Sequence, residues 1–105
     1  MVHYEVNLEI KKNLYEKFLE WLDEHVLEIL NLNGFKQAQI FEENNHNSTD
    51  YYKLTVRYEL DTMSHLQHYF DNHAKIMQNK TNETFGKDVK ASRRILKLNK
   101  ILFRP

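Results

Sequence analysis

The sequence predicts an α+β domain with the order strand, helix, strand, strand, helix, strand, and three observations support this prediction. Two segments, VHYEVNLEI at residues 2–10 and YYKLTVRYEL at residues 51–60, alternate apolar and polar side chains as half-buried strands do. Between them, residues 13–31 repeat apolar side chains at helical spacing. A second, shorter helical pattern follows the later strand. This order is the ferredoxin-like βαββαβ plan, a four-stranded antiparallel sheet with two helices on one face.

The first half of the chain predicts a strand, a long helix and a second strand. The polar face of the first strand carries His3, Glu5, Asn7 and Glu9. Asn13 and Glu16 have the spacing of a capping box, so the helix is expected to span residues 13–31. Gly34 suits the left-handed position that often follows a helix. A short strand is expected at residues 35–41.

The second half of the chain predicts a loop, a strand, a helix and a final strand. Residues 42–50 are all polar and rich in asparagine, which is typical of an exposed hairpin loop. After the second alternating strand, Asp61 or Thr62 is expected to cap a helix that fades near Asn79. The buried stripe of this helix is expected to comprise Met63, Leu66, Tyr69, Phe70, His73 and Met77. Residues 87–98 form the last predicted strand.

The composition indicates one globular domain, residues 1–105, and excludes several classes of function. The chain has 15 Lys and Arg, 15 Asp and Glu, and no cysteine. A net charge of zero lacks the basic field of nucleic-acid binding proteins, so we expect no nucleic-acid partner. The lack of cysteine excludes disulfides and thiolate chemistry and suits a reducing compartment. No apolar run approaches the roughly 20 residues of a membrane span, and the start lacks the features of a signal peptide. We therefore expect no membrane association and a cytoplasmic location.

The sheet face opposite the helices is expected to be covered in the assembled protein. Phe35, Phe41 and Tyr51 are expected on this face, and residues 101–103 form an apolar tail. Apolar surface of this kind on a small domain indicates a partner. The simplest partner is a second copy of the same sheet, which predicts a homodimer with two sheets facing each other. A net charge near zero also favours self-association.

Polar side chains that share a face of neighbouring strands form the first candidate site. The residues are Glu5, Asn7, Thr55, Arg57 and one of Arg93 and Arg94. Arginine and carboxylate groups pair through two parallel hydrogen bonds. Such a cluster is either a cross-strand ion-pair ladder that sets register or the dimer seam, or an anion site in which an arginine holds a carboxylate.

Two histidines on the predicted apolar stripes form a second group. His25 lies on the stripe of the first helix and His73 on that of the second. A buried imidazole needs hydrogen-bond partners, so these are core histidines, acid–base groups, ligand contacts or metal ligands. His65 and His68 are three residues apart, but no third or fourth ligand accompanies them, and no metal site is expected. With two glycines and no phosphate-binding loop, no cofactor is expected either.

Stretches along nearly the whole chain resemble a small bacterial family of unknown function. They are YEVNL at 4–8, WLDEHVLEIL at 21–30, NGF at 33–35, VRYEL at 56–60, HLQHYFDNHA at 65–74, FG at 85–86 and ASRRIL at 91–96. The resemblance implies the dimeric α/β-barrel form of the ferredoxin-like fold. It implies no particular activity, because the family itself is uncharacterised.

The wider superfamily implied by this resemblance includes cofactor-independent and haem-degrading monooxygenases as well as non-enzymatic binding proteins. In the monooxygenases, an asparagine on the first strand works with a tryptophan and a histidine of the second helix. Asn7 is similar to that asparagine, but the second helix here has Tyr69 and His73 and no tryptophan. The haem-degrading set of residues is therefore incomplete in this sequence.

Three functional hypotheses follow. The first is a small-molecule binding homodimer that holds an anionic or aromatic ligand in a cleft between sheet and helices. Its ligand-binding residues would be Glu5, Asn7, His25, Arg57, Arg93 and Arg94, with His73 at the helical wall. The second is a small oxygenase or isomerase in which His73 is the acid–base group and Tyr69 belongs to the rings that stack the substrate. The third is a structural or regulatory interaction module whose ion-pair ladder is a dimer seam.

Overall fold

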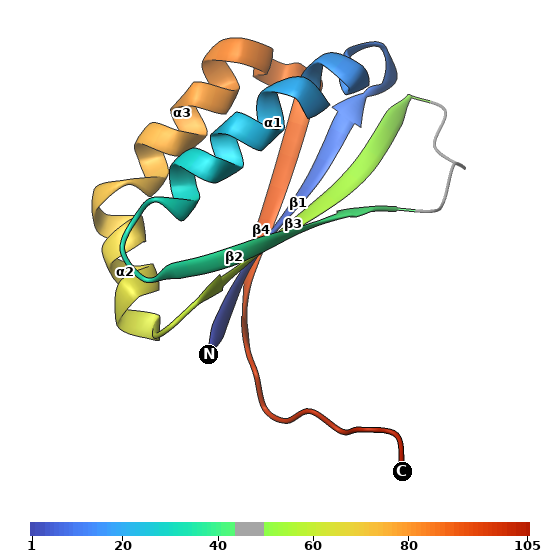
Figure 1. Cartoon of the computed structure of the whole chain (residues 1–105). Helices are drawn as coiled ribbons and strands as arrows, with labels where there is room; N and C mark the ends of the chain where they lie inside the picture. The colour runs from blue at the N-terminus through green and yellow to red at the C-terminus, as the bar shows by residue number, and fades with distance from the viewer. Residues whose placement is uncertain (44–49) are drawn as a thin grey trace.

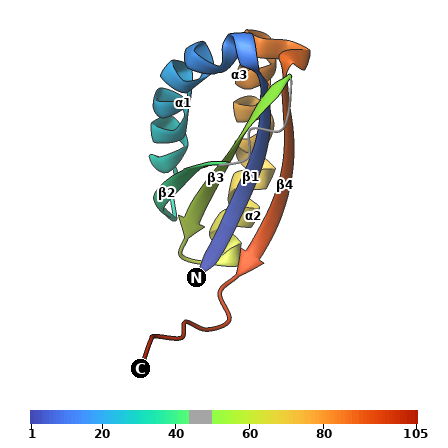
Figure 2. The same ribbon diagram turned by 90° about the vertical axis from the view of Figure 1, so that its right-hand side faces the viewer.

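The computed structural model describes residues 1–43 and 50–105, and these have the expected order of elements (Figure 1). The strands are β1 (Val2–Lys11), β2 (Phe35–Glu42), β3 (Tyr51–Leu60) and β4 (Val89–Lys97), and they form one sheet in the order β2-β3-β1-β4. Every neighbouring pair is antiparallel. The helices are α1 (Tyr15–Leu30), α2 (Met63–Asn72) and α3 (Ala74–Phe85), and all lie on the same face of the sheet (Figures 1 and 2). The predicted ferredoxin-like fold is confirmed.

The hydrophobic core lies between the helices and the sheet face that they cover. Paired residues of antiparallel strands point to the same face, so Leu8 and its partner Leu54 both enter the core. Phe18 of α1 belongs to the same hydrophobic core cluster and is 1% exposed. Burying a side chain of this size stabilises the fold by roughly 1.5–3 kcal/mol. The alternation of apolar residues along the strands therefore determines which face the helices cover.

Helix α1 begins later than the sequence predicted. Strand β1 continues to Lys11, and the Lys12 amide then donates to the Asp50 carbonyl at 3.1 Å. This bond holds the chain at the end of the sheet, and a 3₁₀ turn, η1 (Lys12–Leu14), follows before the α-helix starts. Leu14 occupies the N-cap without a side-chain cap hydrogen bond, so the predicted capping box at Asn13 is wrong.

The single second helix predicted from residue 61 or 62 is two helices. Thr62 caps α2, because its hydroxyl accepts a hydrogen bond from the His65 amide at 3.2 Å. At His73 the backbone leaves the α-helical conformation, with φ −130° and ψ −30°. The chain becomes helical again at Ala74 and stays so to Phe85, beyond the expected end near Asn79. A 3₁₀ turn, η2 (Gly86–Asp88), then delays the last strand to Val89.

The turn after α1 depends on a glycine, as predicted. Gly34 has a φ of +88°, which lies in the left-handed region that favours glycine. A Cβ atom there would lie 2.2 Å from Cγ of His65, so α2 packs directly against the glycine backbone. The Gly34 carbonyl also accepts a hydrogen bond from the Asp61 amide. This turn therefore joins the start of β2 to the start of α2.

The sheet face opposite the helices is covered by none of the described helices. Tyr51 and Phe41 lie on this open face, where Lys90 and Arg57 respectively approach their rings at 4.8 and 5.3 Å. Phe35 was expected there and instead packs against Tyr58 and Tyr69 on the helical side. The reason is a register shift between residues 35 and 37, which turns the Phe35 side chain to the opposite face of the sheet. Of the hairpin loop predicted at 42–50, residues 44–49 lie outside the described residues.

Candidate functional site

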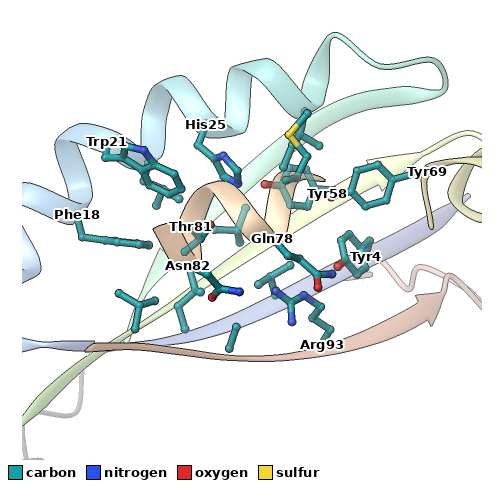
Figure 3. Close-up of a pocket in the computed structure, with 18 residues that line it drawn as sticks. Tyr4, Phe18, Trp21, His25, Tyr58, Tyr69, Gln78, Thr81, Asn82 and Arg93 are labelled. Atoms are coloured by element: carbon teal, nitrogen blue, oxygen red, sulfur yellow. The ribbon is translucent and has the colours of Figure 1, made fainter. Parts of the chain in front are cut away.

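A cavity of about 200 Å³ lies between the sheet and the helices (Figure 3). The strands contribute Tyr4, Tyr58 and Arg93 to its lining, α1 contributes Trp21 and His25, α2 contributes Tyr69, and α3 contributes Gln78, Thr81 and Asn82. In Figure 3, Trp21 and His25 project from α1, while Arg93, Gln78 and Tyr4 gather at the β4 side. Apolar and aromatic walls with a few convergent polar groups are typical of a small-molecule site.

Three tyrosine rings form one end of the cavity. The Tyr4 ring centroid lies 5.9 Å from that of Tyr58 and 5.8 Å from that of Tyr69. Burial raises the pKa of both Tyr58 and Tyr69 above the ordinary value for tyrosine. Both hydroxyls therefore stay protonated at neutral pH and can donate hydrogen bonds. The rings also offer flat apolar surface to a planar ligand.

Arg93 supplies positive charge at the mouth of the cavity. It lies on the exposed edge strand β4, and its side chain and that of Gln78 gather near Tyr4 at the β4 side of the cavity (Figure 3). Burial raises the pKa of Tyr4, and the nearby guanidinium partly opposes that rise. Within residues 1–43 and 50–105, no carboxylate lies within ion-pair distance of Arg93. Its charge is therefore available to an anionic ligand.

His25 is the titratable group of the α1 wall. It is half-buried, and its ring stacks on that of Trp21 with centroids 4.4 Å apart. Burial lowers the pKa of His25, while Glu28 raises it and Lys80 lowers it to a smaller extent. The imidazole is therefore neutral at pH 7 and can accept a proton. It also borders a surface groove that includes Glu28 and Lys80, so it lies between the cavity and solvent.

A separate polar cluster occupies the open face of the sheet. Glu5 is 2% exposed, and its carboxylate pairs with Arg57 at 2.9 Å and with the guanidinium of Arg94. The hydrogen bond from Arg94, followed by that from Arg57, lowers the pKa of Glu5 to about 2 against the opposing effect of burial. Asn7 donates to Glu5 and accepts from the Thr55 hydroxyl at 2.8 Å. This arrangement is a ladder of hydrogen bonds and ion pairs across β3, β1 and β4.

The structure separates the residues that the sequence assigned to one cleft. Arg94 is paired in register with Glu5, whereas Arg93 is opposite Val6 and points to the helical side. Arg93 and His25 line the cavity, while Glu5, Asn7, Arg57 and Arg94 lie on the other face of the sheet. The expectation of one shared site is therefore wrong, because strand parity places the two sets on opposite faces of the sheet.

The two candidate catalytic residues also separate. Tyr69 lines the cavity and is buried. His73 lies at the junction of α2 and α3, outside the cavity lining, with its ring 5.8 Å from that of His68. Asn7 faces away from the helices, so it cannot act with a helical histidine as the superfamily resemblance suggested. In the described part of the chain, no group of three or more potential ligands could hold a metal ion.

Three polar residues of the cavity, all from α3, were missed at the sequence level. Gln78, Thr81 and Asn82 line it, and the last two lie beyond Asn79, where the second helix was expected to fade. Their signal was present in the four-residue spacing of Met77, Thr81 and Phe85, which indicates one more helical face. The polar stretch around them concealed it, because cavity-lining helices have mixed rather than apolar faces.

Solved structures with the same fold were found by comparison. The chain matches a candidate antibiotic biosynthesis monooxygenase from Deinococcus radiodurans with a TM-score of 0.74 and 8% identity, over 100% of this chain and 99% of that one. A dimeric ferredoxin-like protein from an uncultured marine organism matches with a TM-score of 0.73 and 17% identity, over 99% and 100%. A mutant of SnoaB, a cofactor-independent oxygenase from Streptomyces nogalater, matches with a TM-score of 0.65 and 7% identity, over 96% of each chain. At these identities the likeness shows the fold alone.

Comparison of the sequence itself identifies a family. None of the curated proteins compared with the chain matches it. None of the described helices is long and apolar enough to cross a membrane. One family model, described as a domain of unknown function, matches residues 1–99 and agrees with the resemblance seen in the sequence. The chain therefore belongs to the DUF4286 family and has the ferredoxin-like fold of the dimeric α/β-barrel proteins.

Proposed function

We propose that the cavity between sheet and helices binds a small aromatic acid. The observation that carries this proposal is Arg93, a guanidinium without a carboxylate partner among the described residues, beside the ring of Tyr4. A carboxylate on the ligand would pair with Arg93, as guanidinium and carboxylate groups do elsewhere. The ligand ring would lie against Tyr4, Tyr58 and Tyr69, and Gln78 would donate or accept one further hydrogen bond.

The cavity volume limits the ligand to about one ring. An apolar cavity of about 150 Å³ holds benzene in another protein. A cavity of about 200 Å³ therefore fits a substituted single ring and is too small to enclose a haem or a flavin. This favours benzoate-like, hydroxybenzoate-like or phenylacetate-like acids within the anionic or aromatic class expected from the sequence.

Calorimetric titration of a panel of aromatic acids tests this proposal. Benzoate, hydroxybenzoates and phenylacetate are compared with benzamide, which has a similar shape without the charge. Arg93→Gln is expected to weaken acid binding by about 10- to 100-fold, because a hydrogen bond to a charged group contributes about 1.5–3 kcal/mol. Lys97→Gln removes the same charge from the same strand outside the cavity and should leave affinity unchanged. Equal affinity for benzoate and benzamide, or unaltered binding by Arg93→Gln, would refute the proposed anion site.

A second candidate function is catalysis on the same ligand. It is favoured by the neutral imidazole of His25 at the cavity wall and by a fold shared with SnoaB, itself a cofactor-independent oxygenase. The acid–base role first assigned to His73 would then belong to His25, which borders the cavity. Oxygen consumption and product formation with each bound acid, measured for the unmodified chain and His25→Gln, test this candidate. Binding without turnover would leave a ligand-binding protein.

We also propose that the protein is a cytoplasmic homodimer that associates through the open face of the sheet. One solved structure with this fold, over 99% of this chain, is described as dimeric. The open face is free of described helices, and the Glu5 cluster would then belong to the subunit interface rather than to a ligand site. Sedimentation velocity at several concentrations tests the dimer. The cytoplasmic part of the proposal is supported by the lack of cysteine.

A further inference from the structure

The C-terminal segment, residues 98–105, leaves the sheet as an extended tail (Figures 1 and 2). Its start is held by a hydrogen bond from the Leu98 amide to the Met1 carbonyl. Beyond this bond the tail has no helix or strand, and Ile101, Leu102 and Phe103 are 61%, 83% and 84% exposed. Three consecutive large apolar side chains in water indicate a surface that is buried in an assembly.

We propose that residues 99–105 form an arm that pairs with the free edge of β2 in a second copy of this chain. Two copies would exchange arms about a two-fold axis, so that each arm and each β2 edge is used once. This inference rests on the homodimer proposed above and identifies a segment that holds its two subunits together. The recognition mode is the addition of an extended strand to a sheet edge.

The edge of β2 has the chemistry that such an arm needs. In the sheet order β2-β3-β1-β4, β2 pairs only with β3 among the described strands, so one row of its backbone donors and acceptors has no partner in the described part of the chain. Ile40 and Phe41 at this edge are 40% and 44% exposed. An arm laid there would pair its backbone with the edge and bury its apolar residues against these two side chains.

Charge distinguishes β2 from the other free edge of the sheet. The tail contains Lys100 and Arg104 and no acidic residue. The end of β2 carries Glu42, followed by Glu43. Strand β4, the opposite edge, is basic and carries Lys90, Arg93, Arg94 and Lys97. A basic arm is therefore attracted to β2 and repelled by β4.

The arm is poorly placed to reach β2 of its own chain. Strands β4 and β2 are opposite edges, separated by about 14 Å at a spacing of about 4.8 Å per strand. At about 3.3 Å per residue the crossing consumes about four residues, which would leave Ile101 and Leu102 below the strand ends. The match to the dimeric protein extends over 99% of this chain and so includes nearly all of the tail. A second copy is therefore the occupant that the geometry favours.

The oligomeric state of tail variants tests the arm. Sedimentation equilibrium is measured for the unmodified chain, for a chain ending at Leu98, and for Leu102→Ser/Phe103→Ser. Both variants are expected to raise the dimer dissociation constant at least tenfold. Leu27→Ser/Ile76→Ser is the matched control, because these helical side chains are 60% and 55% exposed and lie outside the arm. A monomeric unmodified chain would refute the homodimer itself. An unmodified dimer whose affinity the tail variants leave unchanged would refute only the arm.

Disulfide trapping tests the place where the arm docks, because the chain has no cysteine of its own. A chain with Leu102→Cys is mixed with a chain of different mass carrying Ile40→Cys or Phe41→Cys, and the mixture is oxidised. The expected product is a disulfide-linked heterodimer with at least one of the two β2 variants. Ile95→Cys on β4 is the control and should give none. Linkage to Ile95→Cys alone, or to no position in a protein that sediments as a dimer, would overturn the proposed docking edge.

Discussion

Two neighbouring arginines, Arg93 and Arg94, experience opposite environments because β4 presents them to opposite faces of the sheet. Arg94 is bound to the buried carboxylate of Glu5 on the open face. Arg93 lines the cavity on the helical face beside Tyr4, and no carboxylate among the described residues pairs with it. The sequence shows that both side chains are positively charged. The alternation of facing along β4 decides whether that charge is neutralised by a carboxylate or available to a ligand.

The two faces also differ in what holds them together. The helical face is stabilised by burial of apolar side chains, and the open face by a short ladder of hydrogen bonds and ion pairs. Apolar burial contributes in proportion to area, while each polar contact has a small net effect after desolvation. Substitutions on the two faces are therefore expected to differ in cost and in their dependence on pH.

The largest expected difference is between two adjacent residues of β3. Leu54 is 1% exposed on the helical face, and Leu54→Ala should lower the free energy of unfolding by about 3 kcal/mol through lost burial and a residual cavity. Thr55→Ala on the open face removes one hydrogen bond to Asn7 and should cost about 1 kcal/mol. Urea denaturation measures both values. Equal costs would mean that the helical face is not the main core.

The next effect concerns the charge at the centre of the open face. Glu5→Gln keeps the shape but leaves Arg57 and Arg94 without their carboxylate, and should lower the free energy of unfolding by about 2 kcal/mol. The control is Glu9→Gln, because Glu9 pairs with Lys53 at 3.9 Å on exposed surface, where such pairs contribute under about 1 kcal/mol. If the two variants unfold at the same urea concentration, the Glu5 cluster is not a stabilising ladder.

The same carboxylate predicts how stability depends on pH. The pKa of Glu5 is about 2 in the folded protein, below its ordinary value near 4.5. Between these values the unfolded chain binds the additional proton, so the contribution of Glu5 is complete above about pH 4.5 and is lost as the pH falls toward 2. The unfolding midpoints of the unmodified chain and of Glu5→Gln should therefore converge as the pH is lowered from about 6 to about 2.5. A difference between the two unfolding midpoints that stays constant over this pH range would contradict the low pKa of Glu5.

The smallest expected effect is on the stability of the unliganded protein when Arg93 is replaced. Arg93→Gln should destabilise the chain less than Arg94→Gln, because only Arg94 of the two has a carboxylate partner among the described residues. Thermal unfolding of both variants without added ligand measures this order. A ligand at about 100 times its dissociation constant should stabilise the unmodified protein by about 2.7 kcal/mol and Arg93→Gln by much less. The reverse order of stability would place the essential ion pair on the cavity face.

Much of the fold could be predicted, because the first and third strands alternate strictly and α1 is strongly amphipathic. The site was harder to predict. Parity alone grouped Glu5, Asn7 and Arg57 correctly on one face, but the sequence left Arg93 and Arg94 undecided. The length of α3 was underestimated because its cavity-facing residues are polar, and Thr81 and Asn82 were missed for that reason.

Periodicity along the chain was sufficient for the order of elements, since the spacing of apolar residues is a local property of strands and helices. Pairing across the sheet decided the rest. The register of β4 against β1 places Arg94 opposite Glu5 and directs Arg93 into the cavity. The register shift in β2 places Phe35 on the helical side. The break at His73 moved that residue away from the cavity that His25 borders. These outcomes depend on contacts between segments distant in sequence, so they are set by packing and hydrogen-bond register rather than by any local pattern.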